Sequence, residues 1–434
     1  MRHRFTVRGA MFCLASLALH SVVSLAVADD WPQWGGPQRD LVWREKGIVR
    51  RLPTKELLPR VWASPLGEGY AGPAVAEGRV FITDRLPDSG TDRVLCLDAD
   101  SGEVLWKQER RVQYTVDYSA GPRATPTVDG DRVYAVGTMG DLDCFEVASG
   151  KSLWHKNFVE EFDTKIPIWG MVAPPLVDDN QLITLVGGTG NALVVSFDKL
   201  TGQELWRALE DSEPGYCPPM IYTYQGLRQL IIWHPHAITA LDPANGKTLW
   251  EMDWSIKAGL CVPVPRQEGN RLFLTAFYNG PRMLDLGADG KSPTIVWKGS
   301  SNSEIRTDGL HSIMPTPWVT PTHIYGVCSY GQLRCLDSQT GKRLWETREP
   351  TGDGRWWNAF LIPHEDRFFI HNEQGDLIIA QLSPKGYQEV SRARLVAPTR
   401  EVIGRMTIWS HPAFAMQSVF ARNDKEIVRV NLAE

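Results

Sequence analysis

Leu95-Cys-Leu-Asp-Ala-Asp-Ser-Gly-Glu-Val-Leu-Trp106 is one copy of a stretch that recurs along the chain. In each copy an apolar run leads into an acidic residue, then a short polar turn with a glycine, then a Leu-Trp pair or its equivalent. Successive tryptophans lie 44 to 52 residues apart, a period typical of a β-propeller blade or a comparable solenoid unit. Further copies occupy Asp143–Trp154, Val195–Trp206, Thr239–Trp250, the degraded Met283–Trp297, Arg334–Trp345, and Leu377–Val390, which has lost its tryptophan.

The repeated stretch has the composition of a β-hairpin. Aspartates such as Asp98 can cap the turn through their side chains, and Gly102 can take the left-handed conformation that a hairpin loop of about three to five residues needs. The tryptophan that closes each copy offers a large flat ring for burial between neighbouring units. We therefore expect packing between blades, and no catalytic role, for Trp106, Trp154, Trp206, Trp250, Trp297 and Trp345.

Each repeat also opens on a proline-rich segment such as Ala173-Pro-Pro-Leu176, which leads into a further strand. Four strands per repeat emerge, and no convincing amphipathic helix. Counting the openings, of which the last is at His411, predicts an all-β fold: an eight-bladed β-propeller of four-stranded antiparallel blades. The last blade is one strand short, and residues 60–64 would supply it, so that paired N- and C-terminal strands close the ring. The alternative is a seven-bladed ring with residues 409–434 as an appended hairpin.

The N-terminal residues have the pattern of a secretory signal peptide. Three arginines precede an apolar run without a clear lipobox, and small residues end that run before Asp29. A membrane anchor is the alternative, but the run is short and contains a histidine and several serines. The chain thus divides into a signal peptide (1–28), an N-terminal segment (29–56) and a propeller (57–434). We expect a periplasmic or secreted protein with no transmembrane segment after cleavage.

The charge of the chain limits its partners. The formal net charge of −5 becomes about −8 when the three arginines of the signal peptide are removed. An acidic protein lacks the basic stripe that neutralises phosphates, which argues against a nucleic-acid partner. No Cys/His cluster has the spacing of a metal site, so no metal is predicted. We expect a monomer whose partner is a protein or a cell-envelope polymer.

Six cysteines follow the signal peptide. Three of them lie in equivalent strands, where a small buried apolar residue is the expected role. Export permits disulfides, and two pairs are candidates. These are Cys328 with Cys335, across a hairpin tip, and Cys217 with Cys261, before successive proline-rich strand starts.

The repeats resemble the tryptophan-docking repeats of the pyrroloquinoline-quinone (PQQ) propeller superfamily. Asp30-Trp-Pro-Gln-Trp-Gly-Gly-Pro37 and Ala120-Gly-Pro-Arg-Ala-Thr-Pro-Thr127 are similar to segments of exported quinoprotein-repeat propellers common in bacteria of the planctomycete type. The resemblance spans nearly all of the mature chain and implies the propeller fold. It leaves the chemistry open, because the superfamily contains both cofactor-dependent dehydrogenases and non-enzymatic scaffolds, such as the propeller subunit of the outer-membrane barrel-assembly machinery.

The dehydrogenases of that superfamily carry an adjacent Cys-Cys pair against the quinone, a catalytic Asp, and acidic and amide ligands to calcium or a lanthanide. This sequence has no Cys-Cys pair, no Asp/Glu/Asn trio that maps onto theirs, and no Cys-x-x-Cys-His haem site. We therefore assign no cofactor, and PQQ with calcium is implied by the resemblance alone.

Propellers usually bind ligands where the connections between one blade's outer strand and the next blade's inner strand converge around the axis. In this chain those connections are rich in aromatic residues, arginine and histidine. The predicted ligand-binding face contains Tyr70, Tyr118, Arg123, Trp169, Met171, Tyr216, His311, Arg355, Trp356, Trp357, Asn358, Trp409 and His411.

Several of these residues have two interpretations. Trp356 and Trp357 can form a flat platform for a quinone or a sugar ring, or they can plug the axial tunnel or pack between blades. Arg123 can neutralise a carboxylate or phosphate of a ligand, or it can pair with an acid such as Asp117.

The two histidines of this face, His311 and His411, can be general bases or metal ligands. A lone histidine beside a proline-rich turn is more often hydrogen-bonded to the backbone. Asp308 is the best isolated acid near this face, and a role in proton abstraction would require a raised pKa.

Complete structural repeats beside missing dehydrogenase residues predict an extracytoplasmic binding or assembly module without catalysis. Two alternatives remain open. One is a PQQ-dependent oxidoreductase with a divergent site on the same face, and the other is a polysaccharide-binding propeller that uses the aromatic loops. Nucleophile-elbow, P-loop and zinc-protease spacings are absent from the sequence.

Overall fold

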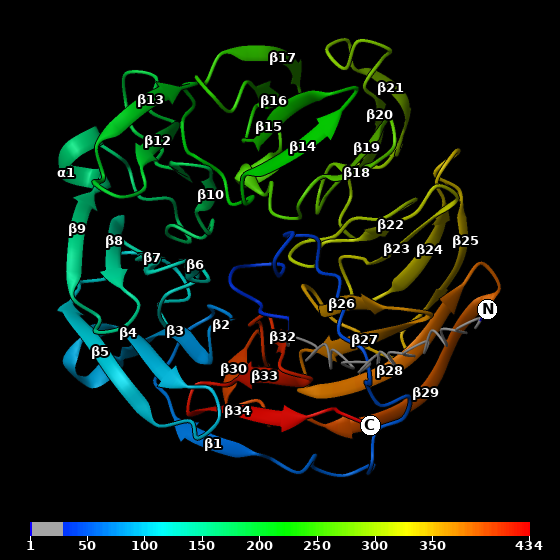
Figure 1. The fold of residues 1–434 in the computed structure, drawn as a ribbon. Coiled ribbons are helices and arrows are strands. Elements are labelled where there is room, and N and C mark those ends of the chain that lie inside the picture. The colour runs from blue at the N-terminus through cyan, green and yellow to red at the C-terminus, as the bar shows by residue number, and fades with distance from the viewer. Residues whose placement is uncertain (2–28) are drawn as a thin grey trace.

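A computed structural model describes Met1 and residues 29–434, so the predicted signal peptide beyond Met1 lies outside the described residues. Eight four-stranded antiparallel sheets are arranged in a ring (Figure 1). This confirms the predicted all-β, eight-bladed propeller. Within residues 29–434, no helix has the length and apolar character needed to cross a membrane.

Seven blades are each formed by four consecutive strands, with the first strand innermost (Figure 1). Blade 1 has β2 (Ala74–Ala76), β3 (Arg79–Leu86), β4 (Thr91–Asp98) and β5 (Val104–Arg111); blade 2 has β6 (Thr127–Asp129), β7 (Arg132–Val136), β8 (Asp141–Glu146) and β9 (Ser152–Asn157). Blade 3 has β10 (Leu176–Asp178), β11 (Gln181–Leu185), β12 (Val194–Asp198) and β13 (Glu204–Ala208); blade 4 has β14 (Met220–Tyr224), β15 (Leu227–Trp233), β16 (Ala237–Leu241) and β17 (Thr248–Asp253). Blade 5 has β18 (Arg266–Glu268), β19 (Arg271–Ala276), β20 (Gly280–Asp285) and β21 (Thr294–Lys298); blade 6 has β22 (Trp318–Val319), β23 (His323–Val327), β24 (Leu333–Asp337) and β25 (Arg343–Thr347). Blade 7 has β26 (Ala359–His364), β27 (Arg367–Asn372), β28 (Asp376–Ser383) and β29 (Gly386–Arg394).

The eighth blade combines the two ends of the chain, and a few small elements lie outside the blades. Blade 8 has β32 (Ala413–Ala415), β33 (Ser418–Arg422), β34 (Glu426–Asn431) and β1 (Trp62–Pro65). Outside the blades are the hairpin of β30 (Arg400–Val402) and β31 (Arg405–Thr407), the short helix α1 (Phe158–Phe162), and single 3-10 turns at Pro87–Ser89 and Lys257–Gly259.

The repeated stretch forms the hairpin between the third and fourth strands of a blade. In blade 1 the Asp98 side chain accepts hydrogen bonds from two backbone N–H groups of the turn (3.0 and 2.8 Å), and Gly102 lies in the left-handed region at φ 75°. A β-bulge in the last strand pair skips Leu105, which leaves this leucine half exposed and places Trp106 on the buried side.

In five of the eight blades, the tryptophan of the outer strand packs against the hairpin glycine of the next blade. Trp106 covers Gly150 so closely that a Cβ atom on the glycine would lie 2.5 Å from the indole, and the indole Nε1 donates to the Val147 carbonyl oxygen (2.8 Å). Glycine is required there both for its positive φ and for the approach of the ring. The same contact joins Trp154 to Gly202, Trp206 to Gly246 and Trp297 to Gly341.

The N- and C-terminal strands close the ring. β1 pairs with β34 beginning with Trp62 opposite Arg429, which completes the eighth blade and rules out the seven-bladed alternative. The Trp62 Nε1 donates to the Ala99 carbonyl oxygen (2.8 Å), and its ring lies against Gly102. Trp62 is therefore the docking tryptophan of blade 8, supplied from the opposite end of the chain.

Blade 7 ends without a docking tryptophan. Its bulge places Ser391 opposite Ile379, where the other blades place the tryptophan, so the equivalent position is Ser391 and not Val390. Blade 8 also lacks the docking turn, because its third strand is the last of the chain and its fourth strand is the first. Residues 47–58 fill this junction and bond to β29 through Ser391 Oγ (3.0 Å) and the backbone of Arg394 (2.9 Å).

Residues 31–48, here called the axial segment, run through the centre of the ring (Figure 1, dark blue). Trp31 exchanges two backbone hydrogen bonds with Val75 of the inner strand β2 (2.8 and 2.9 Å), and the Trp43 N–H donates to the Pro363 carbonyl oxygen (3.0 Å). The axial segment therefore fills the tunnel, which was one of the roles predicted for Trp356 and Trp357.

Arg39 ties the axial segment to the proline-rich openings of two blades. Its buried guanidinium donates to the carbonyl oxygens of Pro175 (3.0 Å) and Pro174 (3.4 Å) in front of blade 3, and to that of Pro219 (3.4 Å) in front of blade 4. Burial lowers the pKa of Arg39 to about 10, so the side chain remains a cation at neutral pH. The proline-rich segments that open the blades thus point carbonyl oxygens toward the axis, and the Arg39 guanidinium donates to three of these oxygens.

Neither predicted disulfide is present, since the six described cysteines are buried free thiols. In the hairpin of blade 6, Cys335 pairs with Tyr325, and Cys328 lies beyond the last paired residue, so the two cysteines do not face each other. The thiols of Cys217 and Cys261 each lie near a backbone carbonyl oxygen instead (3.5 and 3.3 Å).

Truncation of Trp62 to alanine should weaken the junction that closes the ring. Trp62 is 8% exposed, and we expect Trp62→Ala to lower the free energy of unfolding by about 3–5 kcal/mol, measured by urea denaturation. Val61→Ala is the matched control, because this neighbour is 48% exposed. Equal denaturation midpoints for Trp62→Ala and wild type would show that the ring does not depend on this contact.

Replacement of Arg39 by methionine should release the axial segment. Three buried carbonyl oxygens would lose their donor, at a cost of about 1–3 kcal/mol for each group left unsatisfied. We expect chymotrypsin to cut within residues 31–48 of the native Arg39→Met protein and to leave wild type intact there, as read by mass spectrometry. Arg44→Met, which removes an exposed cation from the same segment, should resist like wild type. Equal resistance of Arg39→Met would contradict this role.

Candidate functional site

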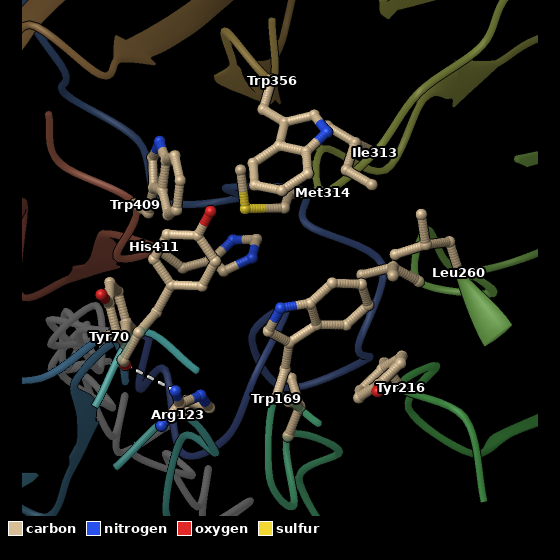
Figure 2. Close-up of a pocket in the computed structure, with 13 residues that line it drawn as sticks. Tyr70, Arg123, Trp169, Tyr216, Leu260, Ile313, Met314, Trp356, Trp409 and His411 are labelled. Atoms are coloured by element: carbon tan, nitrogen blue, oxygen red, sulfur yellow. Dashed lines mark hydrogen bonds between the residues drawn. The ribbon is translucent and has the colours of Figure 1, made fainter. Parts of the chain in front are cut away.

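A cavity of about 190 Å³ opens on the face of the ring where the outer strand of each blade connects to the inner strand of the next. All eight connections contribute to its lining, so the cavity is a product of the whole ring (Figure 2). Its lining residues are Tyr70, Tyr118, Arg123, Trp169, Val172, Tyr216, Leu260, Val262, Ile313, Met314, Trp356, Trp409 and His411.

The structure thus brings eight residues of the predicted ligand-binding face around one cavity, although a ligand for them remains a prediction. Sequence reasoning missed the aliphatic part of the lining. No signal could have found it, because apolar residues in irregular loops look like ordinary core residues. These missed residues are Val172, Leu260, Val262, Ile313 and Met314.

Aromatic rings form two walls of the cavity. Tyr118, Trp356 and Trp409 pack edge to face in a triangle, with ring centroids 5.9, 5.9 and 6.3 Å apart. Trp169 and Tyr216 form the other wall, with centroids 5.4 Å apart (Figure 2). Such walls offer a large flat contact area with few rotatable bonds.

Two of these rings are held by unusual backbone conformations. Tyr118 and Trp356 lie in the left-handed region, at φ 53° and 65°. For bulky residues this conformation costs about 1–3 kcal/mol and persists only where the surroundings enforce it. The Trp356 N–H is bonded to the Ser329 carbonyl oxygen (2.9 Å), which helps to fix the loop. The two rings are therefore positioned before any ligand arrives.

Arg123 is the single charged side chain among the lining residues of the described chain. Its guanidinium donates to the carbonyl oxygens of Tyr118 (2.6 Å), Asp117 (2.7 Å) and Gly121 (2.8 Å), and lies 5.2 Å from the centre of the Tyr70 ring. The alternative of an ion pair with Asp117 is wrong, because the backbone of that residue, and not its carboxylate, accepts the bond. Burial lowers the pKa of Arg123. The cation is thus used to hold the loop that carries Tyr118.

His411 joins the cavity to the axial segment. The Trp34 indole, which can only donate, lies 3.4 Å from His411 Nε2, so that nitrogen accepts and the neutral ring carries its proton on Nδ1. Burial lowers the pKa of His411 to about 3, so the ring is neutral at physiological pH. With one nitrogen protonated and the other engaged, His411 is not arranged as a general base or a metal ligand.

Glu373 does not line the cavity but binds the lining residue Trp409. No sequence pattern indicated this role. Its carboxylate is fully buried and accepts hydrogen bonds from Trp409 Nε1 (3.1 Å), the Asn358 N–H (3.2 Å) and Arg405. Burial raises the pKa of this carboxyl group, while the bond from Arg405 opposes that shift. Glu373 therefore fixes the orientation of the Trp409 ring.

His311 and Asp308 lie outside the cavity. His311 is fully buried, with Nδ1 3.2 Å from the Phe277 carbonyl oxygen, and burial lowers its pKa. Burial would raise the pKa of Asp308, but hydrogen bonds from Ser300 and His311 outweigh it and lower the pKa to about 2. Asp308 thus lacks the raised pKa that proton abstraction requires.

The remaining residues of the predicted face do not line the cavity. Arg355 forms an ion pair with Glu304 (2.9 Å) and lies 4.6 Å from the centre of the Trp356 ring. Trp357 does not line the cavity, and the Arg405 guanidinium lies 4.9 Å from the centre of its ring. Met171 and Asn358 are buried.

The residues of the cavity do not fit PQQ with a metal ion. PQQ carries three carboxylates, whereas the lining supplies one guanidinium that already donates to three backbone carbonyl oxygens. Calcium prefers carboxylate and amide oxygens, and the described lining contains neither. Throughout residues 29–434, no group of three or more His, Cys, Asp or Glu side chains is placed to hold a metal ion.

Comparison with known proteins gives a family and several relatives. The family described as "Outer membrane protein assembly factor BamB" matches residues 40–115, 111–217 and 236–434. A protein of that name from Bordetella pertussis is 23% identical over 341 residues, which cover 73% of this chain and 78% of the relative. Methanol dehydrogenase (cytochrome c) subunit 1 of Methylorubrum extorquens is 26% identical over 228 residues, which cover 46% of this chain and 34% of that protein.

The crystal structure of BamB from Moraxella catarrhalis has the same fold. It superposes with a TM-score of 0.58 at 15% identity, covering 86% of this chain and 97% of that one. The family match spans far more than half of the chain and includes the repeats, the closing strand and all of the cavity lining. This protein therefore belongs to the BamB family of PQQ-like repeat propellers.

Proposed function

We propose that this propeller is an extracytoplasmic binding module that assists protein assembly at the cell envelope. The axial cavity is its binding site, and the ligand is an apolar or aromatic segment of a partner protein. The observation that carries the proposal is the lining, which combines aromatic and aliphatic side chains from all eight connections with one cation already bonded to backbone.

The chemistry of the cavity suits a protein segment. Tryptophan and tyrosine dominate the binding energy of many protein interfaces, because they bury a large area at a small cost in conformational entropy. A cavity of about 190 Å³ has room for one or two side chains and not for a folded domain. Backbone conformations that preset Tyr118 and Trp356 reduce the ordering that binding would otherwise require.

Exposed apolar side chains in the connections between blades enlarge the apolar surface of the face on which the cavity opens. The most exposed apolar side chains of the connection face are Ile305 (67% exposed), Ile168 (55%), Ile403 (45%) and Met406 (44%). Exposed apolar groups around a pocket are typical of protein interaction surfaces. The name "assembly factor" carried by the Bordetella pertussis relative is consistent with such a role.

The two other functions find less support. Catalysis with PQQ would need metal ligands and free cations that the described lining does not contain. A sugar presents many hydroxyl groups, which bind best to carboxylate and amide side chains, and the lining of residues 29–434 offers neither. The methanol dehydrogenase match is confined to 34% of that protein.

A photocrosslinker at Tyr118 should identify the partner in living cells. We expect p-benzoylphenylalanine at position 118 to give a discrete protein adduct on irradiation, identified by mass spectrometry. Trp169→Ala should reduce this adduct about tenfold or more, since loss of a central tryptophan commonly costs 2 kcal/mol or more of binding free energy. Leu200→Ala is the matched control, because Leu200 is 51% exposed on a hairpin away from the cavity. A similar adduct in Trp169→Ala, or none at position 118, would refute the proposed site.

Addition of PQQ and calcium to the purified protein separates binding from redox chemistry. We expect no stoichiometric change in the quinone absorbance and no dye reduction with alcohols or sugars. Stoichiometric binding together with turnover would replace the proposal by the oxidoreductase alternative.

A further inference from the structure

A second hollow lies at the periphery of the ring, between residues 51–55 and the outer strand β29. This hollow, here called the blade-seven groove, has a volume of about 810 Å³. One wall is the exposed edge of β29 from Glu389 to Arg394, and the other is the N-terminal segment that leads to β1. No residue of the axial cavity contributes to it.

The groove exists because blade 7 lacks a docking tryptophan. Ser391 stands at the tryptophan position, and a hydroxymethyl group fills far less space than an indole. The Leu52 N–H reaches Ser391 Oγ (3.0 Å), so the segment is anchored at one point, and space remains beside that contact. The other junctions have an indole where this one has a groove.

The edge of β29 already accepts a strand from the same chain. The Arg394 N–H donates to the Glu56 carbonyl oxygen (2.9 Å), and the Leu58 N–H donates to the Arg394 carbonyl oxygen (2.9 Å), in a parallel bridge. Backbone groups two residues apart in a strand point the same way, so those of Arg392 also face outward. In the described chain, Arg392 pairs with Ile378 of β28, and no backbone hydrogen bond joins Arg392 to a strand on its outer side.

The groove is basic, although the protein as a whole is acidic. Arg392 is paired with Glu389 (2.7 Å), and Arg394 with Asp376 (3.1 Å). In addition, two exposed cations of the other wall, at positions 51 and 55, form no ion pair within residues 29–434. A ligand in the groove would therefore meet an open strand edge on one side and two free cations on the other.

We propose that the blade-seven groove binds an extended acidic polypeptide segment, which adds to the outer edge of β29. Backbone hydrogen bonds to β29 hold the segment, and alternate carboxylates of the segment reach Arg51 and Lys55. This is strand addition, in which main-chain bonds give affinity and side chains give selectivity. The proposal concerns a site separate from the axial cavity and does not depend on the function of that cavity.

Fluorescence anisotropy with labelled peptides tests the proposal. The probe is a nine-residue peptide that alternates glutamate with valine, and its counterpart has lysine in place of each glutamate. We expect saturable binding of the acidic peptide and binding of the lysine peptide at least about tenfold weaker. The double variant Arg51→Glu/Lys55→Glu should weaken binding of the acidic peptide about tenfold and shift the preference toward lysine.

Matched variants exclude general charge and folding effects. Lys151→Glu/Lys342→Glu makes the same charge change at two exposed lysines on other blades and should bind the acidic peptide like wild type. Circular dichroism checks that each variant is folded. Equal affinity for both peptides, no binding of the acidic peptide, or unchanged binding by Arg51→Glu/Lys55→Glu would overturn the proposal.

Two further arms distinguish strand addition from other modes. An acidic peptide with N-methyl groups on alternate amides keeps its charge but cannot form the strand ladder, and it should bind at least about tenfold more weakly. Equal binding of that peptide, or equal binding of heparin, would reveal a general anion site instead. Trp169→Ala should leave the affinity unchanged, and a loss there would place the peptide in the axial cavity. Failure of this proposal therefore remains separable from failure of the proposed function.

Discussion

Docking of an outer-strand tryptophan over a glycine turn of the next blade, which occurs in five of the eight blades, is the contact on which the ring depends. The contact needs two partners, an indole such as that of Trp106 and a turn such as that of Gly150. The indole comes from one repeat and the turn from the next repeat. Where the ring closes, the indole is present but the turn is not. Trp62 arrives from the N-terminus and docks on blade 1, but blade 8 has no turn to offer blade 7, because its last two strands come from opposite ends of the chain. Because no turn lies there to receive an indole, a tryptophan at position 391 would have no docking partner, and serine occupies that position.

The axial segment closes the central tunnel, so the cavity on the axis has a closed end. Its bonds to inner strands satisfy backbone groups that would otherwise face the tunnel, and Arg39 satisfies three proline carbonyl oxygens together. On the cavity side, Trp34 sets the tautomer of His411, while Glu373 holds Trp409 from another direction. Several polar groups around the cavity therefore hold aromatic rings or their loops in place, whereas Tyr216 Oη, Trp356 Nε1 and His411 Nδ1 are buried without a hydrogen-bond partner in the described chain. The described lining contains one cation and no carboxylate or amide side chain, so its surface is mainly apolar, as the proposed binding of an apolar segment requires.

Repetition explains how much of the structure could be predicted from the sequence. The hairpin of Asp98 and Gly102 recurs, so its strands, its turn and the number of blades were predictable, and the short strand count at the C-terminus pointed to the closing strand. The axial segment occurs once and has no period, so nothing in the sequence indicated that it lies in the tunnel. Glu373 was hidden for a similar reason, because an acid in a turn between strands resembles any solvated turn residue until its burial is known. The aromatic part of the lining could be found, since large rings are unusual in loops, whereas the aliphatic part could not.

The first 37 described residues after Met1, residues 29–65, form three separate parts of the structure. Residues 31–48 fill the tunnel, residues 51–55 form one wall of the blade-seven groove, and residues 62–65 complete the last blade. Without them β34 would be an open sheet edge, which proteins avoid because it invites pairing with other chains. Seven repeats and a partial eighth therefore do not make a closed ring by themselves. The apolar cavity on the axis and the basic strand edge at the periphery share no lining residue, so the two polypeptide segments proposed as their ligands would bind to separate parts of the ring.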